Sequence, residues 1–225
     1  MARERYQDRL SDLRAEVGAM ADLTLERYHE SLDVLETGDS LKAQRIIEGD
    51  TELNEWYLDI ENQCVQLIAL QQPVASDLRF IASSFKIVTD LERIGDLATN
   101  LARYGRDGDF EGFPDVGVTA IARMAGEMVT DAMDAYTRDD ADAARAIAER
   151  DDKLDECCQV ATGTVVRELI TSHARAMDTT EIEATLESVS RVLLTVRDLE
   201  RVGDHAVNIC ARTLYMVEND DDLIY

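Results

Sequence analysis

Two stretches of the chain carry nearly the same eleven residues. DLERIGDLATN at residues 90–100 and DLERVGDHAVN at residues 198–208 are identical at eight positions and begin 108 residues apart. A second pair occurs in the same order, IIEGDTELNE at 46–55 and AIAERDDKLDE at 146–156. A chain of 225 residues has room for two units of roughly 100 residues each. The repeat therefore predicts two structural units related by internal duplication.

Both units should be helical. Hydrophobic residues make up 45% of the chain, whereas two prolines and eleven glycines leave few places where a helix must stop. Gly38 is placed to end the first helix and Asp39 to cap the second. Pro73, in the segment QQPVASDLR, fits the first turn of the third helix, and the second unit has TSHARAMDTTE instead. We expect helices over about 3–37, 40–71, 73–105, 114–137, 140–173 and 180–217.

The predicted fold is all-α, with two tandem antiparallel three-helix bundles. The glycine-rich stretch YGRDGDFEGFPDVG marks the linker between them. We place the first bundle at residues 1–107 and the second at 112–225.

The repeated motif puts acidic residues where a helix should be apolar. The positions 4, 7 and 11 residues before Glu92 are apolar, and the same holds before Glu200. Further polar residues continue along one edge of each stripe, and Gly95 and Gly203 indicate close packing of a neighbouring helix. The polar residues on this face are Glu92, Asp96 and Asn100 in the first unit and Glu200, Asp204 and Asn208 in the second.

The shorter repeat shows the same anomaly on the preceding helix. Asp50 falls in line with apolar residues of its helix, and Asp151 does so in the second unit. Asn54 corresponds to Asp155 one turn later. Each bundle should therefore direct polar groups from two helices toward a shared interior.

Unpaired charges there would each cost several kcal/mol, in a domain whose total stability is about 5–15 kcal/mol. A cation between the helices would offset this cost, and oxygen ligands from facing helices suit a divalent or ferric metal ion. The polar residues of both repeats are therefore candidate metal ligands. A metal-free network of buried acids and a set of solvated acids at the bundle edge are the alternatives.

Catalytic signatures are not evident in the sequence. No phosphate-binding loop, nucleophile elbow or Ser/His/Asp set occurs, so we predict that the protein is not an enzyme. A di-iron carboxylate enzyme is the less favoured alternative, because its Glu-x-x-His pattern is missing from both motifs. His205 replaces Leu97 in the second copy, and we expect it on the surface rather than among the ligands.

Charge limits the range of partners. The formal net charge of −24 repels nucleic acids and anionic lipids, and the paucity of lysine fits a surface adapted to molar salt, although an ordinary acidic protein is the alternative. No apolar run is long enough to span a membrane, and the first residues do not read as a secretory signal. The four cysteines lack CxxC spacing, which favours reduced thiols in a cytoplasmic protein.

Taken together, IIEGDTELNE, QQPVASDLR, DLERIGDLATN and DLERVGDHAVNIC resemble the PhoU family of phosphate-specific transport system accessory proteins, over nearly the whole chain. The resemblance implies a cytoplasmic protein of two three-helix bundles whose E(D)xxxD motifs bind metal ions, with iron, zinc, manganese or magnesium as candidates. The acidic, lysine-poor composition, for its part, favours a halophilic archaeal source. Carried over residue by residue, the resemblance implies metal ligation by Glu92, Asp96, Glu200, Asp204, Asp50, Asp151 and Asp155, and more weakly by Asn54, Asn100 and Asn208.

The function implied by this resemblance is negative regulation of phosphate uptake and phosphate homeostasis. Members of the family act as adaptors of the phosphate ABC transporter ATPase subunit and, in bacteria, of a sensor histidine kinase. We expect a homo-oligomer, most simply a dimer. A metal-free helical adaptor or dimerisation module is the alternative function.

Overall fold

The structure is a computed structural model that describes residues 2–70, 73–108, 116–172 and 179–224. The described residues form long helices without any strand, which confirms the all-α prediction. The helices are α1 (Ala2–Thr37), α2 (Ser40–Glu48), α3 (Asp50–Leu70), α4 (Ala75–Asp107), α5 (Val118–Arg138), α6 (Ala141–Ala148), α7 (Asp151–Ser172) and α8 (Thr179–Glu218).

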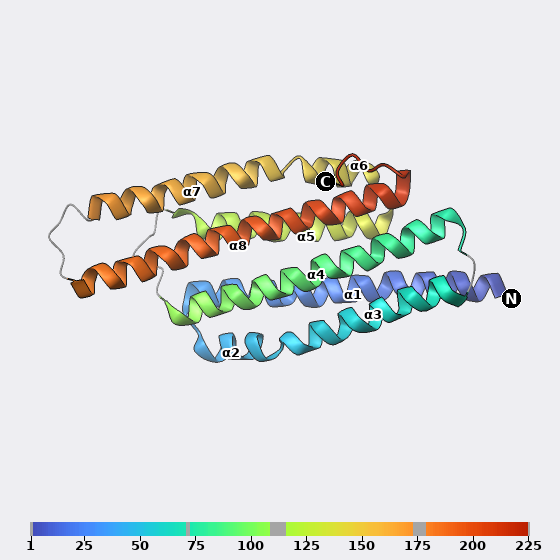
Figure 1. Cartoon of the computed structure of the whole chain (residues 1–225), viewed down its shortest axis with the longest axis horizontal. Helices are drawn as coiled ribbons and strands as arrows, with labels where there is room; N and C mark the ends of the chain where they lie inside the picture. Colours follow the sequence, from blue (N-terminus) through green and yellow to red (C-terminus); the bar gives the residue numbers. More distant parts are fainter. Residues whose placement is uncertain (1, 71–72, 109–115, 173–178, 225) are drawn as a thin grey trace.

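The helices form two similar halves that share their longest contact along α4 and α8. In Figure 1 these two helices run through the middle of the molecule, with α2 and α3 along one edge and α6 and α7 along the other. Helix α4 packs on α1 and α3, and α8 packs on α5 and α7 in the same way. A single hydrophobic cluster extends through both halves. The domain bounds at 1–107 and 112–225 stay a prediction, and residues 109–115 of the expected linker lie outside the described residues.

The end of α1 follows the prediction. Gly38 adopts the left-handed region with φ +66°, which a glycine reaches without strain, and its N–H donates to Val34 O at 2.8 Å. Asp39 then caps α2, because its Oδ1 accepts from the N–H groups of Leu41 and Lys42, each at 3.0 Å.

Two of the six helices were predicted wrongly, because each is divided into two helices in the structure. The expected helix at 40–71 breaks after α2, and the one at 140–173 breaks between α6 and α7. Each break leaves an acid as the first residue of the following helix, Asp50 in α3 and Asp151 in α7. The breaks therefore place both acids at helix N-termini, where the unpaired N–H groups favour a negative charge.

The start of α4 also differs from the prediction. Pro73 does not lie in the first turn, since Val74 has extended backbone with ψ 163° and α4 begins at Ala75. No side chain caps this helix start.

Among the described helices none is sufficiently long and apolar to cross a membrane.

Candidate metal centres

The apolar stripe before each repeated acid is present in the structure. Val88 and Val196, one turn before Glu92 and Glu200, are almost completely buried, whereas the two acids are partly exposed. The two acids thus lie at the end of the buried apolar face of each helix, next to solvent.

Glycine allows the neighbouring helix to approach these acids closely. A Cβ atom on Gly95 would lie 2.6 Å from Leu53 Cδ1 of α3, and one on Gly203 would lie 2.1 Å from Leu154 Cδ2 of α7. Both distances are shorter than a carbon–carbon contact permits. The close packing predicted for the two glycines is confirmed.

The first acid set consists of Asp50 and Asn54 from α3 and Glu92 and Asp96 from α4. Asp50 Oδ1 accepts from the Thr99 hydroxyl at 3.4 Å, and Asp50 Oδ2 lies 3.5 Å from Asn54 Nδ2. Burial raises the pKa of Glu92 most strongly, and the charges of Asp96 and Asp50 add to it. Burial followed by the Asp50 charge raises the pKa of Asp96. These three acids therefore lie close enough to repel one another.

The second acid set consists of Asp151 and Asp155 from α7 and Glu200 and Asp204 from α8. Burial, followed by the charges of Asp155 and Asp204, raises the pKa of Asp151 to about 6. Burial and the Asp155 charge also raise the pKa of Glu200 and of Asp204. Asp151 Oδ1 is buried and has no hydrogen-bond partner among the described residues. A buried carboxylate oxygen without a donor is what a bound cation would satisfy.

The structure does not draw either set into a closed coordination shell. No three carboxylates of the first or second set have oxygens within 4.8 Å of one another, and in the described part of the chain only Asp220, Asp221 and Asp222 meet that spacing. Asp220 in that turn pairs with Arg145 at 2.8 Å. The second set nevertheless fits a hard cation, because it offers four carboxylates and one unsatisfied oxygen. The first set offers three carboxylates and an amide, and it fits less closely.

The later amides of the repeated motif have other partners. Asn100 Oδ1 accepts from Arg103 Nη1 at 2.9 Å. Asn208 Nδ2 donates to Asp90 Oδ1 at 3.2 Å, across the contact between α4 and α8. The structure thus brings the acids together but places these two amides in separate contacts.

The expectation that His205 lies on the surface is wrong. Its side chain is buried, and Nδ1 lies 2.9 Å from Asp90 Oδ1. Position 205 therefore faces α4. Leu97, at the corresponding position of the first copy, is also buried. Asp90 and Asp198 are the identical first residues of the repeat, but the repeat does not indicate that Asp90 contacts the other half.

Asp198 is the buried counterpart of Asp90. The Tyr104 hydroxyl donates to its Oδ2 at 3.0 Å, and guanidinium groups of Arg197 and Arg201 lie 3.0 Å and 3.4 Å from its Oδ1. Asp90 and Asp198 therefore join the two halves, while the other acids of the motif face the neighbouring helix of their own half.

Comparison with known proteins agrees with this architecture. The model of the family described as PhoU domain matches two segments of the chain, residues 17–105 and 118–213. The chain belongs to the PhoU family. The two matched segments correspond to the two copies of the repeat, so the family resemblance carried by the motifs is confirmed.

Relatives of known name align over nearly the whole chain. A phosphate-specific transport system accessory protein PhoU homolog of Pseudomonas putida is 35% identical over 221 residues, which cover 97% of this chain and 82% of that protein. The PhoU accessory protein of Escherichia coli is 31% identical over 218 residues, covering 96% and 86%. The crystal structure of PhoU from Pseudomonas aeruginosa superposes with a TM-score of 0.84 at 34% identity, covering 96% of this chain and all (100%) of that one.

Proposed function

We propose that this protein is a regulatory accessory protein of a phosphate-specific transport system, and that it binds metal cations at its two acid sets. Membership of the PhoU family supports the first part, because relatives that align with nearly the whole chain carry that description. The duplicated acid sets between facing helices support the second.

The observation that carries the cation proposal is the state of Asp151. Its Oδ1 is buried without a donor among the described residues, and four other carboxylates raise its pKa further, three of which belong to the second set. Asp151, Asp155, Glu200 and Asp204 would hold a cation in the second half. Asp50, Glu92 and Asp96, with Asn54, would do so in the first.

A divalent or ferric ion, such as iron, zinc, manganese or magnesium, would supply the positive charge that these acids lack. Without it, the acids of α7 repel those of α8, and the acids of α3 repel those of α4. The side chains in each set therefore connect cation occupancy to the spacing of one helix pair. This connection gives an adaptor protein a means of changing the shape of its surface.

As a negative regulator, the protein would act on the transporter ATPase subunit and, where one is present, on a sensor histidine kinase. The transport-system descriptions of its relatives support a site of action next to the transporter, and we propose that this site is in the cytoplasm. We propose no catalytic step, and we expect a homo-oligomer, most simply a dimer. The charge of −24 favours a partner surface that is basic.

Phosphate uptake by the host is the direct test. Deleting the gene should raise uptake in phosphate-rich medium, and re-expression of the wild-type chain should reverse the change. Re-expression of Glu200→Gln with Asp204→Asn should fail to reverse it, whereas exposed Asp59→Asn on α3 should succeed. Uptake that is the same with and without the gene, in both rich and starved cells, would refute the regulatory role.

The wide spacing of the carboxylates favours one alternative, a metal-free helical adaptor or dimerisation module. Elemental analysis of protein purified without chelator separates the two functions. Bound metal that disappears in the acid-set variants supports the cation proposal. Absence of metal from wild type, with unchanged stability in those variants, supports the alternative.

The acidic surface also supports a host with a salt-rich cytoplasm. We propose that molar potassium chloride stabilises the protein by screening repulsion between its acids. The melting temperature should rise steadily between 0.1 and about 2 M salt. A melting temperature that does not change with salt would contradict this proposal.

A further inference from the structure

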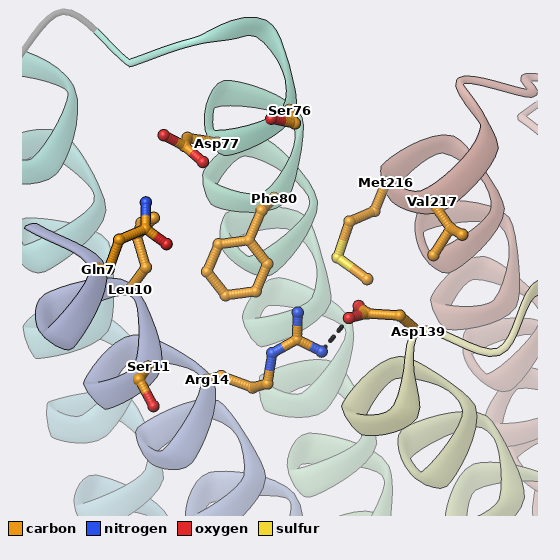
Figure 2. Close-up of a pocket in the computed structure, with 10 residues that line it drawn as sticks. All are labelled: Gln7, Leu10, Ser11, Arg14, Ser76, Asp77, Phe80, Asp139, Met216 and Val217. Carbon is orange, nitrogen blue, oxygen red and sulfur yellow. Dashed lines mark ion pairs between the residues drawn. The ribbon is translucent and has the colours of Figure 1, made fainter. Parts of the chain in front are cut away.

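A cavity of about 480 Å³ opens at one end of the molecule, between its two halves. Figure 2 shows that side chains of α1, the first turns of α4, the residue after α5 and the last turn of α8 surround it. None of the candidate metal ligands lines it. Its α4 residues come from the segment that follows Pro73, for which the second unit has a different sequence. We call this cavity the end pocket.

Arg14 forms part of the floor of the end pocket and is already committed to other contacts. Its Nη1 donates to the carbonyl groups of Tyr136 and Thr137 at 2.8 Å and 3.1 Å, and lies 2.8 Å from Asp139 Oδ1. The guanidinium carbon also lies 4.8 Å from the centre of the Phe80 ring. Arg14 therefore fastens α1 to the end of α5, and Asp139 balances its charge.

Asp77 is the charge in the end pocket that no such partner balances. It lies in the first turn of α4 and is partly buried. Among the described residues it forms no hydrogen bond or ion pair, although the helix end offers it some compensation. The charged lining from the described part of the chain consists of Arg14, Asp77 and Asp139, so one negative charge remains there. A cationic group would complement this pocket, and an anion would not.

The remaining wall of the end pocket combines polar residues (Gln7, Ser11 and Ser76) with an apolar part. Leu10, Phe80 and Met216 line it and are mostly buried. Outside the pocket, Val74 immediately before α4 and Leu78 next to Asp77 are exposed over 53% and 43% of their respective surfaces. A lysine or arginine side chain combines a cationic end with an apolar stem, which matches a carboxylate beside the apolar surfaces of Leu10, Phe80 and Met216.

We propose that the end pocket receives a lysine or arginine side chain, flanked by aliphatic residues, from a partner protein. At low ionic strength the charge of −24 on the chain also favours approach of such a basic segment, whereas at molar salt only the contact with Asp77 itself favours it. The aliphatic neighbours of the basic residue would contact Val74 and Leu78. Docking here would serve the accessory role proposed above, but it does not depend on cation binding by the acid sets.

Methyl NMR of the full chain tests this proposal. Protein labelled with ¹³C at the methionine methyl groups provides a signal from Met216 in the pocket, assigned with Met216→Leu. The probes are two acetylated, amidated peptides, Ala-Leu-Arg-Leu-Ala and the same peptide with glutamate in place of arginine. The arginine peptide should shift the Met216 signal in a saturable manner, and the glutamate peptide should not. The signals of buried Met20 and Met128 report that the fold is intact.

Asp77→Asn should weaken binding of the arginine peptide about three- to fivefold, the effect of losing one partly exposed ion pair. Asp12→Asn is the matched control. It also removes one negative charge, from the part of α1 that carries Arg14, but Asp12 does not line the pocket. Equal weakening by both variants, equal shifts with both peptides, or an unmoved Met216 signal would overturn the proposal. The double variant Glu92→Gln with Asp96→Asn should bind the peptide as wild type does. Its metal binding is measured separately by calorimetry, so a failure of the metal proposal can be told apart from a failure of the docking proposal.

Discussion

The two acid sets descend from one repeated motif but differ in what satisfies them. In the first set, Asp50 has a hydroxyl group near one oxygen and an amide near the other. In the second set, Asp155 takes the place of Asn54, and Asp151 Oδ1 has no donor in the described structure. Two differences between the copies, Asp155 in place of Asn54 and Val207 in place of Thr99, thus remove from the second set both groups that contact Asp50 in the first.

The pKa values follow this difference. The pKa of Asp151 is raised to about 6, with Asp155 as the leading charge. No acid takes that position in the first set, where an amide stands. We therefore expect the second half to bind cations more tightly than the first, and the following changes are ordered from the largest expected effect to the smallest.

Glu200→Gln with Asp204→Asn should have the largest effect. Removing two of four carboxylates should weaken Mn²⁺ binding at the second set on the order of 100-fold or more, since even supporting groups around a metal contribute 10- to 100-fold. Glu92→Gln with Asp96→Asn should leave the tighter binding event intact in a calorimetric titration. If both double variants weaken the same Mn²⁺ binding event to the same degree, the two acid sets do not differ in cation affinity.

His205→Leu gives the second copy the residue that the first copy has at this position. The change leaves Asp90 buried with Asn208 as its remaining described side-chain donor, and it should lower the free energy of unfolding by about 1–3 kcal/mol. Urea denaturation measures this loss. His29→Leu, at an exposed position of α1, is the control and should change stability by less than about 0.5 kcal/mol. Comparable losses in both variants would show that the Asp90 contact has no special role.

Gly203→Ala and Gly95→Ala compare the packing beside the two sets. Overpacking typically costs about 1–3 kcal/mol, and the better helix propensity of alanine offsets about 1 kcal/mol of this. Gly203→Ala should cost more, because the new Cβ atom would lie 2.1 Å from Leu154 Cδ2 and 3.3 Å from Asp151 Oδ1. It should also weaken Mn²⁺ binding. A larger loss of unfolding free energy in Gly95→Ala would reverse the comparison.

Asp151→Asn should stabilise the metal-free protein slightly. Because the folded-state pKa of Asp151 is raised to about 6, the folded state holds a proton that the unfolded state releases near pH 4. The contribution of Asp151 to stability therefore falls as the pH rises from about 4 to 6. Allowing for solvent screening, the asparagine variant should gain about 1 kcal/mol at pH 7 and almost nothing at pH 4. Urea denaturation at the two pH values checks this, and a gain that is the same at both would contradict it.

Much of the fold could be predicted because its signals are local. The duplicated motif and the apolar stripes before Glu92 and Glu200 predicted paired helices in two copies, and Gly38 with Asp39 marked one helix boundary. The breaks before Asp50 and Asp151 were missed, because the apolar pattern continues across them. Only the break after Gly49 has a glycine at its boundary, and the second has no comparable signal.

The candidate site was predictable in part for the same reason. Charged residues on an apolar stripe identified the two acid sets from helical periodicity alone. The burial of His205 against Asp90, and of Asp198 against Tyr104, depends on how α4 packs on α8. The pattern within one unit contains no information about the contact between the two units. The end pocket was missed because residues far apart in the chain, such as Arg14 and Met216, form it together.

Anomalous scattering from crystals soaked in Mn²⁺ tests the central claim most directly. At limiting Mn²⁺ the account predicts a peak among Asp151, Asp155, Glu200 and Asp204, with a second peak between Asp50 and Glu92 only at higher concentration. Peaks that occur only at the turn of Asp220–Asp222, or no peak at either acid set at saturating Mn²⁺, would contradict it.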